Sequence, residues 1–155
     1  MLRELKEGSP APEISLNTDT GEPFRLSSLR GKNVVLYFYP KADTPGCTKE
    51  ACEFRDSSKK FSKVNTVIVG VSPDTDTAQA RFKTKFDLPF TLLADKEHEA
   101  AEAYGVWKEK SMYGRKYMGV ERTTFVIDAN GAIKKIFPKV KVDGHAEEVL
   151  SALDE

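Results

Sequence analysis

Cys47 and Cys52 are the two cysteines of this 155-residue chain, and they lie five residues apart. Two cysteines cannot build a disulfide scaffold, and in a reducing compartment a close pair is more often catalytic or redox-sensing than structural. The reactive form of cysteine is the thiolate, which a helix N-terminus and nearby cations favour. Nucleophilic or redox chemistry at this pair is therefore the first interpretation.

The residues before Cys47 are typical of a helix N-terminus. Thr44 is suited to be the N-cap and Pro45 the first helical residue, which makes Cys47 the third. Gly46 lets a small ligand approach the backbone amides. The Thr44 hydroxyl is expected to bond a substrate or the thiolate.

Attack of a thiolate on a hydroperoxide is an in-line displacement at oxygen. Such a site needs hydrogen-bond donors at both peroxide oxygens, because charge develops on the leaving one. Thr44 and the amides of Gly46 and Cys47 are candidates for these donors. Arg122, which opens an expected strand, is the candidate for an additional guanidinium donor.

Helix geometry limits what Cys52 can do. In a regular helix, five residues give about 7.5 Å of rise and about 140° of rotation, so the two Cα atoms lie roughly 8.6 Å apart. A disulfide tolerates at most about 7 Å. A resolving role for Cys52 therefore requires the first helical turns to unwind after Cys47 is oxidised, and the reduced and oxidised forms should differ in helix content.

The elements that must position these residues alternate in kind. Strands are expected at residues 33–39, 66–71, 90–93, 122–128 and 132–137, helices at 44–61, 77–86, 97–104 and 145–153, and an N-terminal hairpin at 14–16 and 23–26. The helix at 44–61 has an inward stripe of Cys47, Ala51, Phe54 and Phe61, with Ser58 in its gap. Residues 105–119 are expected to form an irregular, mobile, aromatic-rich loop. This order predicts an α/β fold, a central mixed β-sheet flanked by helices, and it resembles a thioredoxin fold.

Composition favours one soluble globular domain over residues 1–155. Lys and Arg number 24 and Asp and Glu also 24, so the charge expected of a nucleic-acid or anionic-membrane protein is missing. Residues 1–8 do not read as a signal peptide, and no stretch approaches the roughly 20 apolar residues of a spanning helix, so a cytoplasmic protein is expected. No phosphate-loop motif suggests a nucleotide cofactor.

Several further side chains have a structural and a functional interpretation. His98 and His145 lie far from the cysteines in sequence, so neither a metal site nor a catalytic imidazole is expected. Trp107, Tyr113 and Tyr117 either pack or edge a pocket for an apolar hydroperoxide, and packing is the favoured interpretation.

Four sequence motifs resemble those of one family. Pro40-x3-Thr44-x2-Cys47 resembles the peroxidatic-cysteine motif of peroxiredoxins, which have a thioredoxin fold. Thr44-Pro-Gly-Cys-Thr-Lys-Glu-Ala-Cys52 resembles the subfamily called bacterioferritin comigratory protein or peroxiredoxin Q. Glu121-Arg-Thr-Thr-Phe-Val-Ile-Asp128 is similar to the strand with the active-site arginine of the family, and Gly70-Val-Ser-Pro73 to its second-strand exit. The resemblance spans residues 8–153.

This resemblance implies a role for each matching residue. It implies Cys47 as peroxidatic cysteine, Cys52 as resolving cysteine, Thr44 and Arg122 as peroxide-binding groups, Pro40 as the shield of the pocket and Glu50 as the partner that orients Arg122. It further implies cofactor-free reduction of hydrogen peroxide and organic hydroperoxides, through a Cys47 sulfenic acid and a Cys47–Cys52 disulfide. A thioredoxin-like protein is then the reductant, and the chain a monomer or weak dimer.

Two other functions remain open from the residues. A protein disulfide oxidoreductase on the same fold usually has Cys-x-x-Cys, and Thr44 stands where the first cysteine would be. A redox sensor or holdase would be oxidised at Cys47 but turn over slowly.

Overall fold

The computed structural model describes residues 5–153. The strands are β1 (Ser15–Thr18), β2 (Pro23–Arg25), β3 (Asn33–Phe38), β4 (Thr66–Ser72), β5 (Thr91–Ala94), β6 (Trp107–Met112), β7 (Arg115–Val120), β8 (Thr123–Ile127) and β9 (Ile133–Phe137). The α-helices are α1 (Pro45–Asp56), α2 (Ser58–Lys63), α3 (Asp76–Phe86), α4 (Glu99–Ala103) and α5 (His145–Leu153), and a 3-10 turn, η1 (Leu26–Leu29), follows β2.

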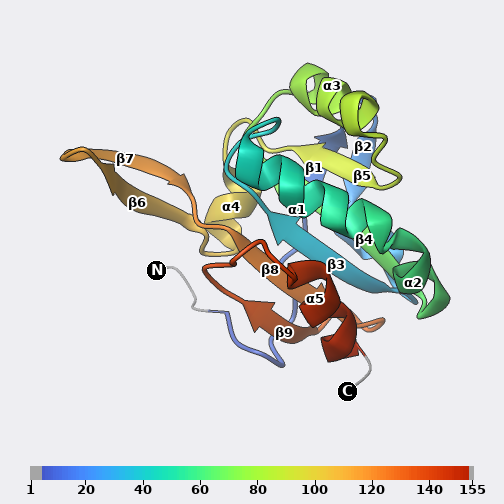
Figure 1. The fold of residues 1–155 in the computed structure, drawn as a ribbon. Coiled ribbons are helices and arrows are strands. Elements are labelled where there is room, and N and C mark those ends of the chain that lie inside the picture. Colours follow the sequence, from blue (N-terminus) through green and yellow to red (C-terminus); the bar gives the residue numbers. More distant parts are fainter. Residues whose placement is uncertain (1–4, 154–155) are drawn as a thin grey trace.

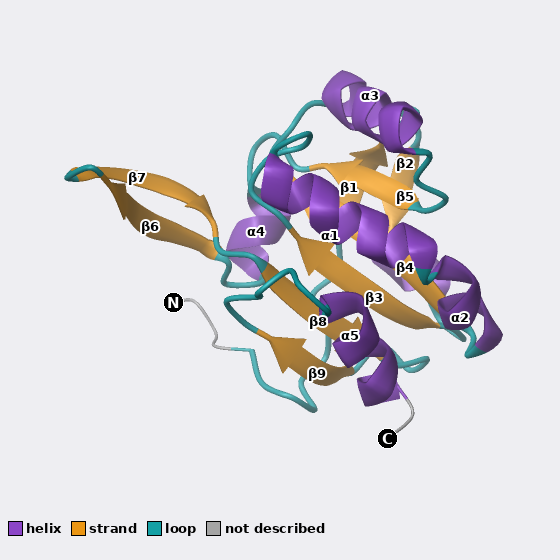
Figure 2. Ribbon diagram, in the orientation of Figure 1, coloured by secondary structure: helices purple, strands orange, loops and turns teal. Residues whose placement is uncertain are grey.

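Seven strands form one mixed sheet in the order β2-β1-β5-β4-β3-β8-β9 (Figure 2). β3 pairs parallel with β4, and β4 parallel with β5, whereas β8 pairs antiparallel with both β3 and β9. The N-terminal hairpin β1–β2 pairs antiparallel with β5. The expected fold class, a central mixed sheet with flanking helices and an N-terminal hairpin, is confirmed.

Side chains of β3 alternate between two cores, one on each face of the sheet. Val35 and Tyr37 point into a core shared with α1, α2, α3 and α5, called here the α1-side core. Val34, Leu36 and Phe38 point into a core shared with α4 and β8, called here the α4-side core. A strand buried on both faces explains why its sequence is continuously apolar. Figure 1 shows α1 and α5 over one face and α4 over the other.

The expectation of an irregular loop at 105–119 is wrong. β6 and β7 form an antiparallel hairpin outside the seven-stranded sheet, and it projects from the body (Figure 1). Its turn residues Tyr113 and Gly114 have φ of 52° and 78°. Positive φ at both central residues is the geometry of a tight two-residue hairpin turn. The turn lacks the Asn-Gly pair that is common in such hairpins, and most side chains of the two strands are exposed rather than buried. The sequence therefore has neither of the two features that usually predict a hairpin.

The single helix expected at 44–61 is two helices. Ser57, with φ of −99° and ψ of 0°, separates α1 from α2. The inward stripe of Cys47, Ala51, Phe54 and Phe61 is buried as expected, but Ser57 rather than Ser58 is the buried serine of the gap.

Candidate active site

Cys47 lies at the third position of α1, as the sequence predicts, and is 1% exposed. Thr44 has extended backbone geometry at the N-cap position and Pro45 begins the helix. The expected side-chain cap is absent, because the Thr44 hydroxyl donates instead to the carbonyl oxygen of Lys41 at 2.9 Å. That bond commits the hydroxyl proton, so Thr44 offers an acceptor oxygen here rather than the donor that the sequence predicts. The amides of the first helical turn have no intrahelical acceptor and are suited to bind an anionic group.

Arg122 lies beside Cys47 because of the sheet register. It immediately precedes β8, whose first residue, Thr123, pairs with Phe38 at the end of β3. The chain leaves β3 through Pro40, which is half-buried, and enters α1 a few residues later. The register therefore places Arg122 at the sheet edge where α1 begins.

The guanidinium of Arg122 bridges two residues of α1. Its Nη2 donates to Cys47 Sγ at 3.2 Å, and its Nη1 donates to Glu50 Oε1 at 2.6 Å. Cys47 and Glu50 are three residues apart in a helix, so their side chains share a face. The planar fork of an arginine fits such a pair, whereas the single ammonium of a lysine does not.

Burial controls the ionisation of this group. Glu50 is 1% exposed, and burial raises its pKa to about 7 although the Arg122 charge and hydrogen bond act in the opposite direction. Burial opposes the charge of Arg122 as well, but Glu50 and the Cys47 thiolate outweigh it and raise the pKa of the guanidinium. Glu50 Oε2 is buried without a hydrogen-bond partner. Near neutral pH, the Glu50 carboxyl group is therefore present in both its protonated and its ionised form.

The absence of a side chain at Gly46 leaves space for the guanidinium of Arg122 as well as for a ligand. A Cβ at this position would lie 3.3 Å from Arg122 Nη2, which is closer than ordinary van der Waals contact. A larger residue would therefore press on the nitrogen that contacts Cys47.

Cys52 is half-exposed on the same helix, and both thiols are free. α1 is continuous from Pro45 to Asp56, so the structure does not bring Cys52 to Cys47. Two free thiols on an intact helix are the arrangement that helix geometry predicts for the reduced protein.

Sequence reasoning missed the residues that anchor the loop before Cys47. Asp74 Oδ2 accepts hydrogen bonds from the amide of Ala42 at 2.8 Å and from the Ser72 hydroxyl at 2.6 Å. Gln79 on α3 donates to Ser72 Oγ and accepts from the Tyr39 hydroxyl. The sequence feature that could have identified them is the polar segment Ser-Pro-Asp at the end of β4. The carboxyl ends of the parallel strands β3 and β4 lie at the same sheet edge, so this segment is expected beside the loop that follows β3.

None of the aromatic and histidine candidates has a hydrogen bond or ion pair with Cys47 among the described residues. Trp107 stacks on His98 with ring centroids 4.1 Å apart, which agrees with the packing interpretation. Tyr113 is 99% exposed at the hairpin turn and Tyr117 is also exposed, so the packing interpretation is wrong for these two tyrosines. His145 is buried between α1 and β9.

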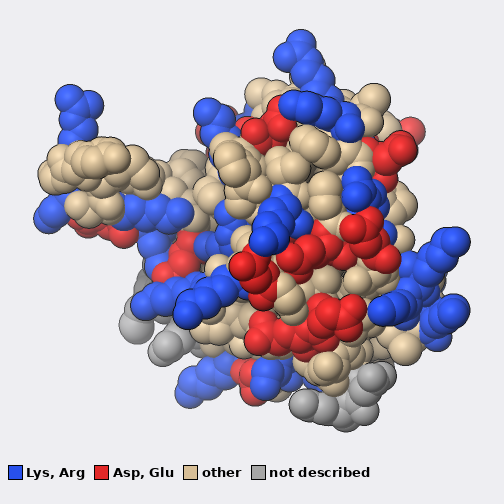
Figure 3. Space-filling model, in the orientation of Figure 1, with Lys and Arg blue, Asp and Glu red and all other residues tan. Residues whose placement is uncertain are grey.

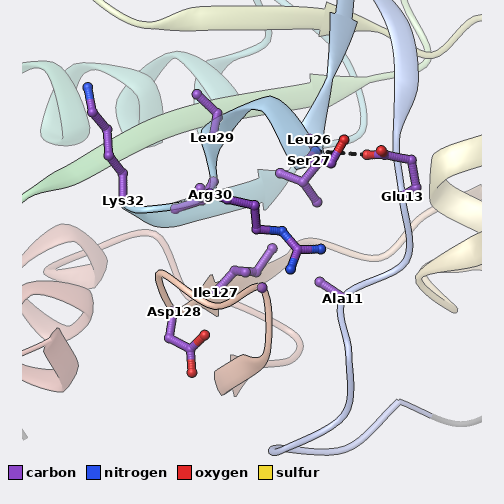
Figure 4. A pocket seen from close by; sticks show the side chains of 11 residues that line it. Ala11, Glu13, Leu26, Ser27, Leu29, Arg30, Lys32, Ile127 and Asp128 are labelled. Carbon is purple, nitrogen blue, oxygen red and sulfur yellow. Dashed lines mark hydrogen bonds between the residues drawn. The ribbon is translucent and has the colours of Figure 1, made fainter.

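A cavity of about 50 Å³ lies at the opposite end of β3 from Cys47 (Figure 4). Glu13, Arg30 and Asp128 line it, together with apolar side chains. Three of its charged groups are engaged: Glu13 accepts from the Ser27 amide, Arg30 donates to the carbonyl of Asn130, and Asp128 accepts from the amides of Asn130 and Ala132. None of the predicted site residues lines this cavity.

Comparison with known proteins assigns the family. Residues 8–136 match the AhpC/TSA family. The chain belongs to this family. It is 53% identical to a putative peroxiredoxin bcp of Coxiella burnetii over 96% of this chain and 99% of that protein. It is 51% identical to peroxiredoxin Bcp of Bacillus subtilis, over 96% of this chain and 95% of the relative.

Solved structures agree with this assignment. The peroxiredoxin Q C47S mutant of Xylella fastidiosa superposes with a TM-score of 0.93 at 34% identity, covering 98% of this chain and 97% of that one. The bacterioferritin comigratory protein of Xanthomonas campestris has a TM-score of 0.87 at 38% identity, over 91% of this chain and 90% of the other. The protein is thus a peroxiredoxin of the Bcp type, a thiol-dependent peroxidase, and the resemblance in its motifs is confirmed.

Neither a membrane span nor a metal cluster is found within residues 5–153. No helix in that range is long and apolar enough to cross a membrane. No group of three or more His, Cys, Asp or Glu side chains among the same residues is placed to hold a metal ion.

Proposed function

We propose that this peroxiredoxin reduces hydrogen peroxide and alkyl hydroperoxides at Cys47, and that Cys52 and a thioredoxin-like protein restore the thiol. The contact of Arg122 Nη2 with Cys47 Sγ at 3.2 Å carries this proposal, because it joins a cation to the candidate nucleophile at a helix N-terminus. The relative from Xanthomonas campestris is described as having an alkyl peroxide reduction activity, which supports the choice of substrate.

In the first step, the Cys47 thiolate attacks one peroxide oxygen. The sulfur–oxygen bond forms as the oxygen–oxygen bond breaks, and the leaving oxygen takes a proton to become water or an alcohol. Sulfur is oxidised to a sulfenic acid and the peroxide is reduced. Arg122 and the amides of the first turn of α1 stabilise the developing charge, and the oxygen of Thr44 accepts a hydrogen bond from the bound peroxide.

In the second step, the Cys52 thiol attacks the sulfenic sulfur, a disulfide forms and water leaves. An external dithiol then reduces this disulfide by exchange and is itself oxidised to a disulfide. Because both cysteines lie on the continuous helix α1, the second step requires the turns around Cys47 to unwind. Pro40 and Glu50 support the site, Pro40 by shielding it and Glu50 by orienting Arg122.

Stopped-flow fluorescence of Trp107 tests this proposal. Reduced wild type, Cys47→Ser and Cys52→Ser are mixed with substoichiometric hydrogen peroxide and, separately, with an alkyl hydroperoxide. We expect fast consumption by wild type and Cys52→Ser, a trapped sulfenic acid in Cys52→Ser, and no fast phase in Cys47→Ser. A wild-type rate no faster than that of free cysteine would overturn the proposal.

A coupled assay with thioredoxin, thioredoxin reductase and NADPH tests the recycling step. Wild type should turn over many times, whereas Cys52→Ser should stop after one turnover because its sulfenic acid has no internal partner. Sustained turnover of Cys52→Ser at the wild-type rate would remove Cys52 from the mechanism.

A further inference from the structure

The projecting hairpin has two unlike faces. Paired residues of an antiparallel ladder share a face, so the β6–β7 register assigns every side chain. One face, called here the cationic face, holds Lys108, Lys110, Met112, Arg115, Tyr117 and Gly119. It contains three cations and no acid. Figure 3 shows lysine and arginine side chains along this hairpin.

The packing at the base of the hairpin shows to which side of the sheet the cationic face is turned. On the opposite face, Val120 is buried in the α4-side core and Trp107 packs against that core. Cys47 belongs to the α1-side core, on the other side of the sheet. The face that is turned away from Trp107 and Val120 is therefore on the Cys47 side.

Lys110 is directed along this face to the base of the hairpin. It pairs with Tyr117, but its side chain crosses diagonally over Gly119, whose missing Cβ would lie 3.5 Å from Lys110 Cδ and 3.7 Å from Cε. Lys108 leans in the same direction, since its ammonium lies 2.8 Å from Glu121 Oε2. The next residue after Glu121 is Arg122.

Lys110 is half-buried, and its ammonium has no carboxylate at ion-pair distance among residues 5–153. The groups that act on it are those of the site: burial and the Arg122 charge lower the pKa of Lys110, while the Cys47 thiolate and Glu121 act in the opposite direction. Glu50 is engaged by Arg122 and Glu121 by Lys108. Lys110 thus lies over Gly119 on the face opposite Trp107 and Val120, and no carboxylate of the described residues pairs with it.

We propose that Lys110 is a second cation of the active site, carried by the hairpin over Gly119, which together with Arg122 favours the Cys47 thiolate. It acts through the field at sulfur rather than by touching the peroxide, so it is a positioning residue. This inference rests on the proposed function in one respect, namely that Cys47 is the nucleophile.

The direct test measures the fraction of Cys47 present as thiolate, from its ultraviolet absorbance against pH in a Cys52→Ser background. Lys110→Gln should lower this fraction about threefold to tenfold at pH values where the thiol is mostly protonated, since one pH unit corresponds to a factor of ten. Lys110→Arg should retain the wild-type curve. Lys116→Gln is the matched control, because Lys116 lies on the other face beside Glu109 and should leave the curve unchanged.

Rates of peroxide consumption by the same variants give the second readout. Lys110→Gln should lose rate at acidic pH and recover toward wild type as pH rises and the thiol ionises. An equal thiolate curve for Lys110→Gln and Lys116→Gln would overturn the inference, as would a rate loss that is the same at every pH. A wild type that ionises Cys47 but consumes peroxide slowly would instead overturn the proposed function, and the Lys110 result would still be decided by absorbance.

Discussion

At the scale of single residues, the site depends on the two-pronged contact of Arg122. One nitrogen contacts the sulfur of Cys47 and the other contacts Glu50, so two residues of α1 fix the direction of the guanidinium. An ammonium supplies charge but cannot make both contacts with planar geometry. Position therefore matters here in addition to charge.

Replacement of Arg122 by lysine tests that distinction. We expect Arg122→Lys to fold normally and to lose about 10²–10³-fold in kcat/KM for hydrogen peroxide, the range for loss of one oriented donor to a developing anion. Stopped-flow rates and circular dichroism measure the two effects. Near-normal rates for Arg122→Lys would show that charge alone suffices.

Glu50 makes the rate dependent on pH near neutrality. Burial raises its pKa to about 7, so the carboxylate that holds Arg122 becomes protonated as pH falls through that value. We expect the wild-type rate to fall below about pH 7. Glu50→Gln, which cannot ionise, should lose this part of the profile and retain a lower, flatter rate. Stopped-flow kinetics from acidic to alkaline pH measure both curves, and parallel profiles would contradict the assignment.

At the scale of elements, α1 has two opposing tasks. Its intact first turn presents Cys47 to Arg122, and in the proposed cycle the same turn opens so that Cys52 reaches the oxidised sulfur. Glu50 and Cys52 lie on that helix as well, so α1 contains most of the predicted site residues. The proposed cycle therefore needs a helix that is stable in the reduced state and opens after oxidation.

Oxidation should consequently reduce the helix content. We expect one equivalent of hydrogen peroxide to lower the helical circular dichroism signal of wild type and a dithiol to restore it. Cys52→Ser forms no disulfide and should keep its signal after the same treatment. An oxidised wild type with unchanged helix content would exclude unwinding.

The sequence predicts elements well where burial determines them. The continuous apolar run of β3 predicts a buried strand, and the apolar spacing of α1 predicts a helix with one buried face. The structure confirms both predictions. The β6–β7 hairpin escapes sequence-based prediction because most of its side chains are exposed and its turn depends on backbone torsions at Tyr113 and Gly114. The break at Ser57 escapes it because the apolar spacing continues across that residue.

The site is only partly predictable for a different reason. Cys47, its place in the helix and Arg122 follow from local patterns and from the family motif. The contacts of Asp74 with Ala42 and of Lys110 with Gly119 depend on register between segments far apart in sequence, which no local pattern contains. The sequence predicts that the Thr44 hydroxyl caps the helix. Its bond to the Lys41 carbonyl could not be predicted, because that bond depends on the conformation of the folded loop.

At the scale of the whole molecule, His145 joins four elements. It begins α5, its Nε2 is 2.8 Å from Thr124 Oγ1 on β8, and its Nδ1 is 2.9 Å from Glu148 Oε1. Its ring also lies edge-on to Phe54 of α1 and Phe137 of β9. That residues 1–155 form one domain stays a prediction, and a single unfolding transition would support it.

The stability of the fold should decrease in mild acid through His145. Burial lowers its pKa below the ordinary value of 6.5, although Glu148 acts in the opposite direction. The unfolded chain therefore takes up a proton first, and the free energy of unfolding falls as pH drops below about 6.5. His145→Gln should be less stable at pH 8 by about 1–3 kcal/mol and should lose less on acidification. Urea unfolding at several pH values measures this, and equal slopes for both proteins would contradict it.

In the proposed cycle, the placement of Glu50 one turn beyond Cys47 makes peroxide binding depend on the redox state of each molecule. Opening of the first turn of α1 would separate Cys47 from Arg122, and unwinding that reaches Glu50 would remove the carboxylate anchor of Arg122 as well. An oxidised molecule would then offer peroxide no binding site, and peroxide would not compete with the reductant for it. Recovery would depend on how fast a partner reduces the disulfide and how fast α1 closes again, so the pool of closed molecules would report the balance between oxidant and reductant.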